Sequence, residues 1–226
     1  MQNVRLLTSR SHVQGRQVSG YPLLTLFASF VCAANALNIG CPELLRTYSV
    51  PRTSIECTIW EAARATSAAP TFFKRIKIGR KHMEQEFIDA ALGCNNPSME
   101  VLKEADIAFG PDRKVDCLLS IGTGQKGVIG LVKPDRFQKL LPTNAIPMLI
   151  RLTTDAEITN DRVHIRFRNN PGVYFRLNVS HGMQNITLEE WKRIGEVRTH
   201  TANYLKNSQV SAEVDDIIDA ILGKKR

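Results

Sequence analysis

The chain lacks the cysteine and histidine spacings that hold metals or redox centres in proteins. Its five cysteines include no C-x-x-C pair, and its five histidines form neither H-x-x-x-H nor H-E-x-x-H. A zinc site and a thioredoxin-type motif are therefore not indicated, and we expect no metal and no cofactor. Three cysteines lie in apolar runs typical of buried thiols, and a reducing compartment fits the set best. The cysteines are Cys32, Cys41, Cys57, Cys94 and Cys117.

Charge is absent from residues 17–42, and this gap has two interpretations. Three arginines precede it, residues 23–34 resemble the apolar part of a secretory signal, and residues 34–36 (ANA) imitate a cleavage site. Against this, Pro22 and Asn35 interrupt the apolar run, which is shorter than the about 20 residues that a membrane-spanning helix needs. The alternative is a buried strand, which also appears as a continuous apolar run. We expect a cytoplasmic protein that can associate peripherally with membranes.

Repeats and low-complexity linkers are also missing. Hydrophobic residues make up 43% and charged residues 23% of the chain, which excludes disorder, collagen and coiled coil as the main architecture. A chain of 226 residues can bury a core without disulfides or a metal, and its length suggests one domain or at most one and a half.

The positive charge is concentrated in three places. The formal net charge is +8, with three arginines in residues 1–16 and three basic residues at 224–226. The third place is a basic cluster of Lys74, Arg75, Lys77, Arg80 and Lys81. The remaining chain is near neutral, so we expect no nucleic-acid partner. Beside Phe72 and Phe73, the basic cluster suits an anionic lipid surface, and the alternative is a solvated loop.

Apolar runs alternate with amphipathic stretches along the chain. The patterns predict strands at residues 26–34, 86–90, 115–121 and 173–179. They predict helices at residues 55–69, 97–108, 147–161, 188–206 and 212–222. This alternation indicates an α/β fold with a mainly parallel sheet, whose chemistry lies beyond the carboxyl ends of its strands.

Two polar turns follow predicted strands. Asp89 ends one strand and is followed by small residues, so its carboxylate either meets a substrate or caps the turn that follows. Residues 122–127 (GTGQKG) match G-x-G-x-x-G, but Pro134 shortens any following helix and no acidic residue stands about 20 positions further on. A plain tight turn is therefore expected there, rather than a dinucleotide site.

Three segments in a fixed order carry a family resemblance. They are residues 59–73 (IWEAARATSAAPTFF), 87–97 (FIDAALGCNNP) and 119–124 (LSIGTG). Their order and spacing resemble the patatin-like phospholipase family, especially its fungal members. The resemblance runs from about residue 29 to about residue 205 and includes residues 174–179 (YFRLNV).

The resemblance implies a three-layer α/β sandwich and a Ser–Asp dyad that hydrolyses acyl esters of lipids. In such a dyad the serine hydroxyl needs a base, and the developing oxyanion needs backbone N–H donors. The family's D-G-G or D-G-A motif corresponds to Asp89, Ala90 and Ala91, so the resemblance makes Asp89 the general base. It makes Ala90, Ala91, Asn95 and Asn96 the residues that support the motif.

The chain also departs from the family pattern. It contains no G-x-S-x-G, because Ser120 and Ser180 have a glycine only two positions after the serine and Ser67 has neither glycine. Ala90 replaces a usual glycine and would be strained if its φ were positive. We therefore expect an N-terminally truncated, C-terminal portion of a patatin-like domain that carries the base without the nucleophile. A truncated gene product and a non-catalytic paralogue both remain open.

These features define the expected organisation and partners. Residues 1–25 are an atypical segment, residues 26–207 a partial patatin-like domain, and residues 208–226 a helix with a basic tail. The expected function is that of a lipid acyl hydrolase, inactive as this chain, and the alternative is a non-catalytic lipid- or membrane-binding protein. The expected partner is a lipid or membrane surface that meets the basic cluster. A truncated sheet edge would also favour self-association or aggregation.

Overall fold

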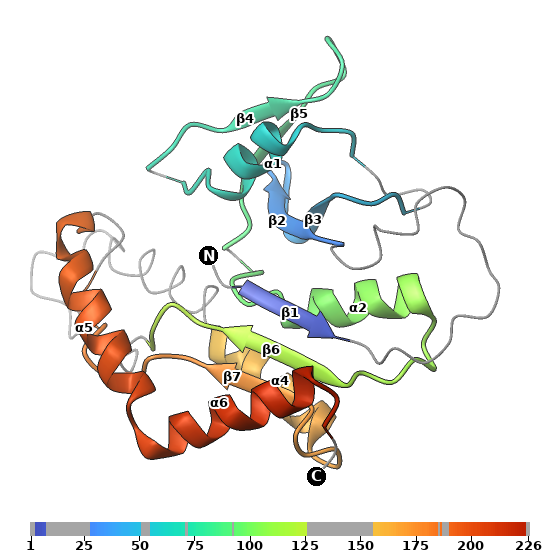
Figure 1. The fold of residues 1–226 in the computed structure, drawn as a ribbon. Helices are drawn as coiled ribbons and strands as arrows, with labels where there is room; N and C mark the ends of the chain where they lie inside the picture. The colour runs from blue at the N-terminus through green and yellow to red at the C-terminus, as the bar shows by residue number, and fades with distance from the viewer. Residues whose placement is uncertain are drawn as a thin grey trace, which may run out of the picture. The chain divides into compact units, whose positions relative to one another are not determined.

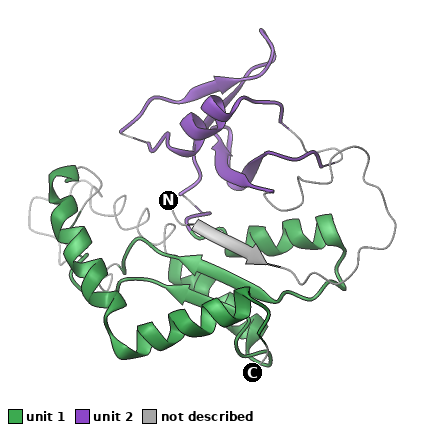
Figure 2. Cartoon of the chain, in the orientation of Figure 1, with its two compact units in different colours: residues 1–10, 96–226 green, residues 11–95 purple. Residues whose placement is uncertain are grey.

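A computed structural model describes residues 3–7, 28–50, 55–70, 72–91, 93–125, 156–184, 186 and 190–224. The chain divides into two compact units, which Figure 2 shows in different colours. Unit 2 comprises residues 11–95, and unit 1 comprises residues 1–10 and 96–226. The domain boundaries expected from the sequence, after residues 25 and 207, stay predictions.

Unit 2 is built on a four-stranded antiparallel sheet in the order β3-β2-β5-β4 (Figure 1). Its strands are β2 (Phe30–Asn35), β3 (Asn38–Arg46), β4 (Ile76–Ile78) and β5 (Gln85–Asp89). β2 and β3 form a hairpin whose turn is closed by the Asn35 side chain, which accepts a hydrogen bond from the Leu37 N–H at 3.0 Å.

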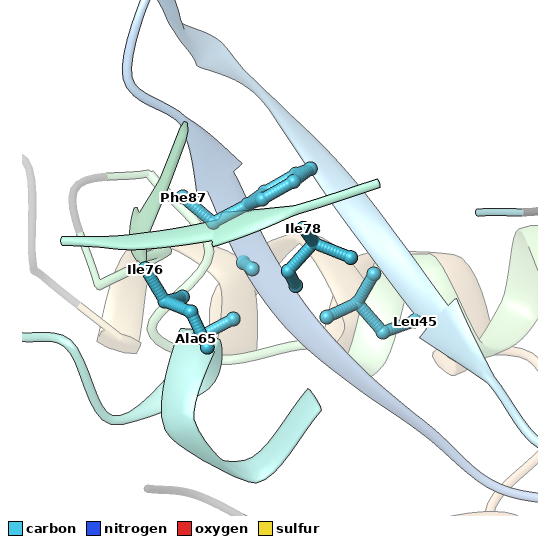
Figure 3. Close-up of a cluster of buried hydrophobic side chains, with 6 residues drawn as sticks. Leu45, Ala65, Ile76, Ile78 and Phe87 are labelled. Atoms are coloured by element: carbon cyan, nitrogen blue, oxygen red, sulfur yellow. The ribbon is translucent and has the colours of Figure 1, made fainter. Parts of the chain in front are cut away.

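One helix, α1 (Ile59–Thr66), packs on this sheet. It begins at a capping box in which the Thr58 hydroxyl accepts the Glu61 N–H at 3.2 Å and the Glu61 carboxylate accepts the Thr58 N–H at 2.7 Å. Its buried Ala65 lies against β-strand side chains in the main core of unit 2, which Figure 3 shows. This core contains Ala33, Leu45, Ala65, Ile76, Ile78 and Phe87.

Unit 1 is built on a three-stranded sheet in the order β1-β6-β7. Its strands are β1 (Asn3–Leu7), β6 (Cys117–Ile121) and β7 (Tyr174–Leu177). β6 and β7 are parallel, and β1 lies antiparallel to β6. The helices are α2 (Ser98–Phe109), α4 (Ala156–Phe167), α5 (Ile194–Leu205) and α6 (Ser208–Ile221), with a 3₁₀ turn at Trp191–Arg193 before α5.

Helices pack on both faces of this small sheet. Successive strand residues point to opposite faces, so each face presents its own apolar side chains to the helices. Leu118 and Tyr174 cluster with Leu102 of α2 and Val163 of α4. Their neighbours Cys117 and Phe175 cluster instead with Ile217 of α6. None of the helices in the described ranges combines the length and apolar character needed to cross a membrane.

Most predicted elements are present, with shifted ends. The predicted strands contain β2, β5, β6 and β7 almost entirely, and α1, α2, α5 and α6 fall largely within predicted helices. Residues 147–155 of one predicted helix lie outside the described residues, and α4 begins at Ala156. The patterns did not predict β1, β3 or β4.

The fold is mixed α/β, but the expected mainly parallel sheet needs correction. Of the five strand pairings in the described residues, only β6–β7 is parallel. The apolar run of β2 does reflect packing on both faces, since Ala33 and Ala34 belong to different hydrophobic clusters. Such packing occurs in central strands of either direction, so the run could not specify how β2 pairs.

Phe87→Ala is expected to lower the free energy of unfolding by about 3–5 kcal/mol, because it leaves a cavity in the main core of unit 2. Phe87 is fully buried, whereas Leu37 is 96% exposed, so Leu37→Ala is the matched control. The control should change stability by less than about 0.5 kcal/mol. Urea unfolding followed by circular dichroism measures both, and equal losses would contradict this core.

Candidate functional site

Asp89 lies at the end of β5, where two of the three motif segments meet. The β2–β5 register pairs Asp89 with Ala33. The Asp89 N–H also donates to the Ala68 carbonyl at 3.0 Å, in the segment that follows α1. The segments 59–73 and 87–97 are therefore joined at Asp89 itself. The third segment, 119–124, belongs to unit 1.

The Asp89 carboxylate is half-buried and held by its own turn. Its Oδ1 accepts a hydrogen bond from the Ala91 N–H at 2.9 Å. Burial raises the pKa of the carboxyl above its ordinary value, and the bond from Ala91 opposes part of that rise. Within the described residues no second donor contacts this carboxylate. Asp89 therefore caps its own turn. Its partial burial also makes the carboxylate a better proton acceptor than an exposed one.

The turn after Asp89 adopts ordinary backbone conformations at the two alanines. In the described residues His82 is the one non-glycine with a positive φ, so Ala90 is not strained. Ala90 is buried, and its carbonyl accepts the Cys94 N–H at 2.9 Å. The left-handed position falls on Gly93, with φ of 121°. Position 90 therefore does not require a glycine.

Asn95 and Asn96 stand at the boundary between the two units, with Asn95 the last residue of unit 2. Asn96 is buried and lies two residues before α2. Its side-chain oxygen accepts the Ser98 N–H at 3.2 Å and the Ser98 hydroxyl at 2.6 Å. Its amide nitrogen donates to the Ala156 carbonyl at 3.2 Å, at the start of α4. These contacts give Asn96 a structural role in unit 1.

All five side chains of the basic cluster are exposed. Arg75 and Lys77 lie 3.4 Å and 3.7 Å from the Glu86 carboxylate on β5. The Arg64 guanidinium donates to the Lys74 carbonyl and lies 5.8 Å from the Phe73 ring centre, which fixes the start of this loop against α1.

An exposed apolar surface adjoins the basic cluster, and the sequence indicated its Phe73 but not its Leu37. Leu37, at the β2–β3 turn, is 96% exposed, and Phe73 is 61% exposed. Between the hairpin and the loop lies a cavity of about 510 Å³. Its walls are Ala36, Ile39, Pro70, Phe73, Lys74, Arg75 and Ile88. The sequence signal for the β2–β3 hairpin that carries Leu37 is the pair of asparagines that flank its turn, Asn35 and Asn38.

In unit 1, a partly buried polar network holds the turn after β6. The Arg176 guanidinium donates to the Ser120 hydroxyl at 2.8 Å and to the Glu157 carboxylate at 2.6 Å. Asn178 donates to the same carboxylate at 3.1 Å and accepts the Gly124 N–H at 2.8 Å. The sequence did not predict this network, because its members come from three separate elements.

The network explains the glycines after β6 without a nucleotide. A Cβ at Gly122 would lie 2.2 Å from the Asn178 side-chain oxygen, so glycine is needed for this close packing. The geometry favours the tight-turn interpretation of residues 122–125, and residues 126–127 of the motif lie outside the described residues.

No protein-family model matches the chain. Among curated proteins it is similar to phospholipase A I of Arabidopsis thaliana, with 38% identity over 66 residues, which are 29% of this chain and 5% of that protein. It is similar to human calcium-independent phospholipase A2-gamma, with 28% identity over 165 residues, 71% of this chain and 19% of that protein.

A longer similarity is to patatin-like phospholipase 1 of Plasmodium falciparum, with 26% identity over 215 residues. It covers 82% of this chain and 31% of that protein, so the chain spans less than a third of each of these relatives. The chain is thus related to the patatin-like phospholipases through similarities that cover part of its length.

Proposed function

We propose that this chain carries the acid–base part of a patatin-like lipid acyl hydrolase site, with Asp89 as the general base. One observation carries the proposal: the backbone of Asp89 is bonded to Ala68, so the two motif segments of unit 2 converge on one half-buried carboxylate. The relatives are named phospholipases, which supports a lipid ester as the substrate class.

In this proposal the Asp89 carboxylate takes the proton of a serine hydroxyl as the oxygen attacks the acyl carbon. A pKa raised by burial suits that task, because it strengthens the carboxylate as a base. The fold proposed for the complete site is the three-layer sandwich of the family, with this chain's residues 26–207 as part of it. Ala91 keeps one carboxylate oxygen fixed, and in this proposal Ala90 and Asn95 are the residues that support the motif.

The chain itself holds no G-x-S-x-G sequence, so we propose that it has no ester-hydrolysing activity alone. Ser67 donates its hydroxyl to the Ala63 carbonyl at 2.8 Å, as a residue at a helix end. Ser120 is fully buried and accepts the bond from Arg176. Neither geometry presents an oxygen for attack on a substrate.

A second candidate function is lipid binding without catalysis. The exposed Leu37 and Phe73, the adjoining cavity and the exposed cations Lys74 and Arg75 support it. Apolar tips beside cations bind anionic lipid surfaces through burial of the tips and attraction of the charges. For this chain alone, both candidates expect lipid binding and no turnover, and they differ in whether Asp89 serves as a base once a serine is supplied.

The purified chain is expected to show no turnover of a short-chain acyl ester above the buffer rate, because the nucleophile is missing. A chromogenic ester assay measures this. Turnover that is lost in Asp89→Asn and retained in Asp112→Asn, the change of an exposed aspartate, would contradict the proposed inactivity.

Binding to anionic vesicles is expected to weaken by about tenfold or more when Lys74, Arg75 and Lys77 are changed to glutamate, and to weaken with added salt. The matched control changes three exposed lysines of unit 1, Lys103, Lys192 and Lys206, to glutamate and so alters net charge equally. Vesicle co-sedimentation measures both variants. Equal losses in the two would show a general charge effect and contradict a specific surface.

Asp89→Asn is expected to stabilise the chain at neutral pH. The pKa of Asp89 is higher in the folded chain than in the unfolded chain. The protonated carboxyl therefore favours the folded state at a pH below the unfolded-state pKa, and this contribution is lost as pH rises through the folded-state pKa. Asparagine retains an oxygen acceptor for the Ala91 N–H without a buried charge. Urea unfolding at acid and neutral pH should show the gain only at neutral pH, and a gain at acid pH alone would contradict it.

A further inference from the structure

Two cysteines that are 62 positions apart in the sequence meet beside the Asp89 turn. The Sγ of Cys94 lies 3.3 Å from the Sγ of Cys32. Cys32 belongs to β2, and Cys94 lies in the turn that follows β5. Both belong to unit 2, and neither is in a disulfide.

Strand register and turn geometry together produce this contact. The antiparallel pairing of Ala33 with Asp89 places Cys32 beside the point where the chain leaves β5. The bond from the Cys94 N–H to the Ala90 carbonyl, 2.9 Å, then folds the turn back toward β2. Cys32 and Cys94 pack together against Ala34, Ile88 and Ala90. This is the opposite face of β2 from Ala33, which packs toward α1.

The pair is more accessible than the buried thiol of Cys117. Cys32 and Cys94 are partly exposed, whereas Cys117 is buried. Burial also raises the pKa of Cys117 and of Cys57, which lowers the fraction of each present as the reactive thiolate. A small cavity of about 10 Å³ lies beside Cys94.

We propose that Cys32 and Cys94 form a thiol–disulfide modification site whose oxidant is a small disulfide such as oxidised glutathione. One thiolate attacks a sulfur of the oxidant and releases one small thiol, and the second cysteine then attacks the mixed disulfide and releases the other. Two protein thiols become one disulfide, and one molecule of oxidant becomes two thiols. The sulfurs must approach from 3.3 Å to the bonded distance of about 2.05 Å.

The bridge would join β2 covalently to the turn that holds the Asp89 carboxylate. Ala91 donates its N–H to Asp89 and lies between Asp89 and Cys94, in the turn that the bridge would tether to β2. Oxidation would therefore restrict the backbone that positions Asp89. The chemistry of the pair does not depend on Asp89 being a catalytic base, so its test stands apart from the proposed function.

The test incubates the full chain with an excess of oxidised over reduced glutathione, blocks remaining thiols by alkylation and maps disulfides by mass spectrometry after trypsin. Cys94 falls in the peptide 82–103, whereas Cys32 and Cys41 share the peptide 17–46. The experiment is therefore run in parallel on Cys41→Ser, in which Cys32 is the one thiol of that peptide. The expected result in both chains is a 17–46 to 82–103 bridge, exceeding each mixed disulfide by about tenfold or more.

Two further measurements keep the proposal falsifiable. Cys94→Ser should abolish the bridge and leave Cys32 as a mixed disulfide or an alkylated thiol. In the wild-type chain, oxidation should slow amide hydrogen exchange in residues 90–94, and dithiothreitol should reverse this. Loss of the bridge in Cys41→Ser, or glutathione on both Cys32 and Cys94 with no bridge, would overturn the proposal.

Discussion

The pairing of β2 with β5 is the constraint on which the described features of unit 2 depend. Its register sets Asp89 opposite Ala33, and the same strand end bonds through its backbone to Ala68 after α1. A shift of one residue would turn every side chain of β5 to the opposite face. Phe87 would leave the core beneath α1, and Asp89 would no longer stand beside the small residues that admit its turn. Core packing and the position of the carboxylate are therefore fixed by one set of strand contacts.

That constraint also determines the surroundings of the carboxylate. The Asp89 side chain is half-buried at the end of β5, and the residue that follows it, Ala90, is buried. Partial burial raises its pKa, and a single backbone hydrogen bond holds its orientation. A structural cap and a catalytic base use the same geometry here. The relation to phospholipases, together with the convergence of two motif segments, favours the catalytic interpretation as our proposal.

Sequence patterns predicted the elements whose local signals are strong. The apolar run before Gly122 predicted β6, and the apolar run that ends at Asp89 predicted β5. Pro97 marked the beginning of α2. They missed β3, because Gly40 and Pro42 within it are unusual in strands and are tolerated here at the edge of the sheet. They also missed the contact of Cys32 with Cys94 and the Arg176 network. These join residues far apart in the sequence, so only the folded chain reveals them.

The most direct test of the account is the pKa of Asp89 itself, measured by ¹³C NMR of its labelled carboxyl through a pH titration of the folded chain. The assignment is made by comparison with Asp89→Asn. The account predicts a pKa above that of aspartate in an unstructured peptide, because the carboxylate is partly buried at the end of β5. A pKa at or below the peptide value would contradict a carboxylate prepared to act as a base.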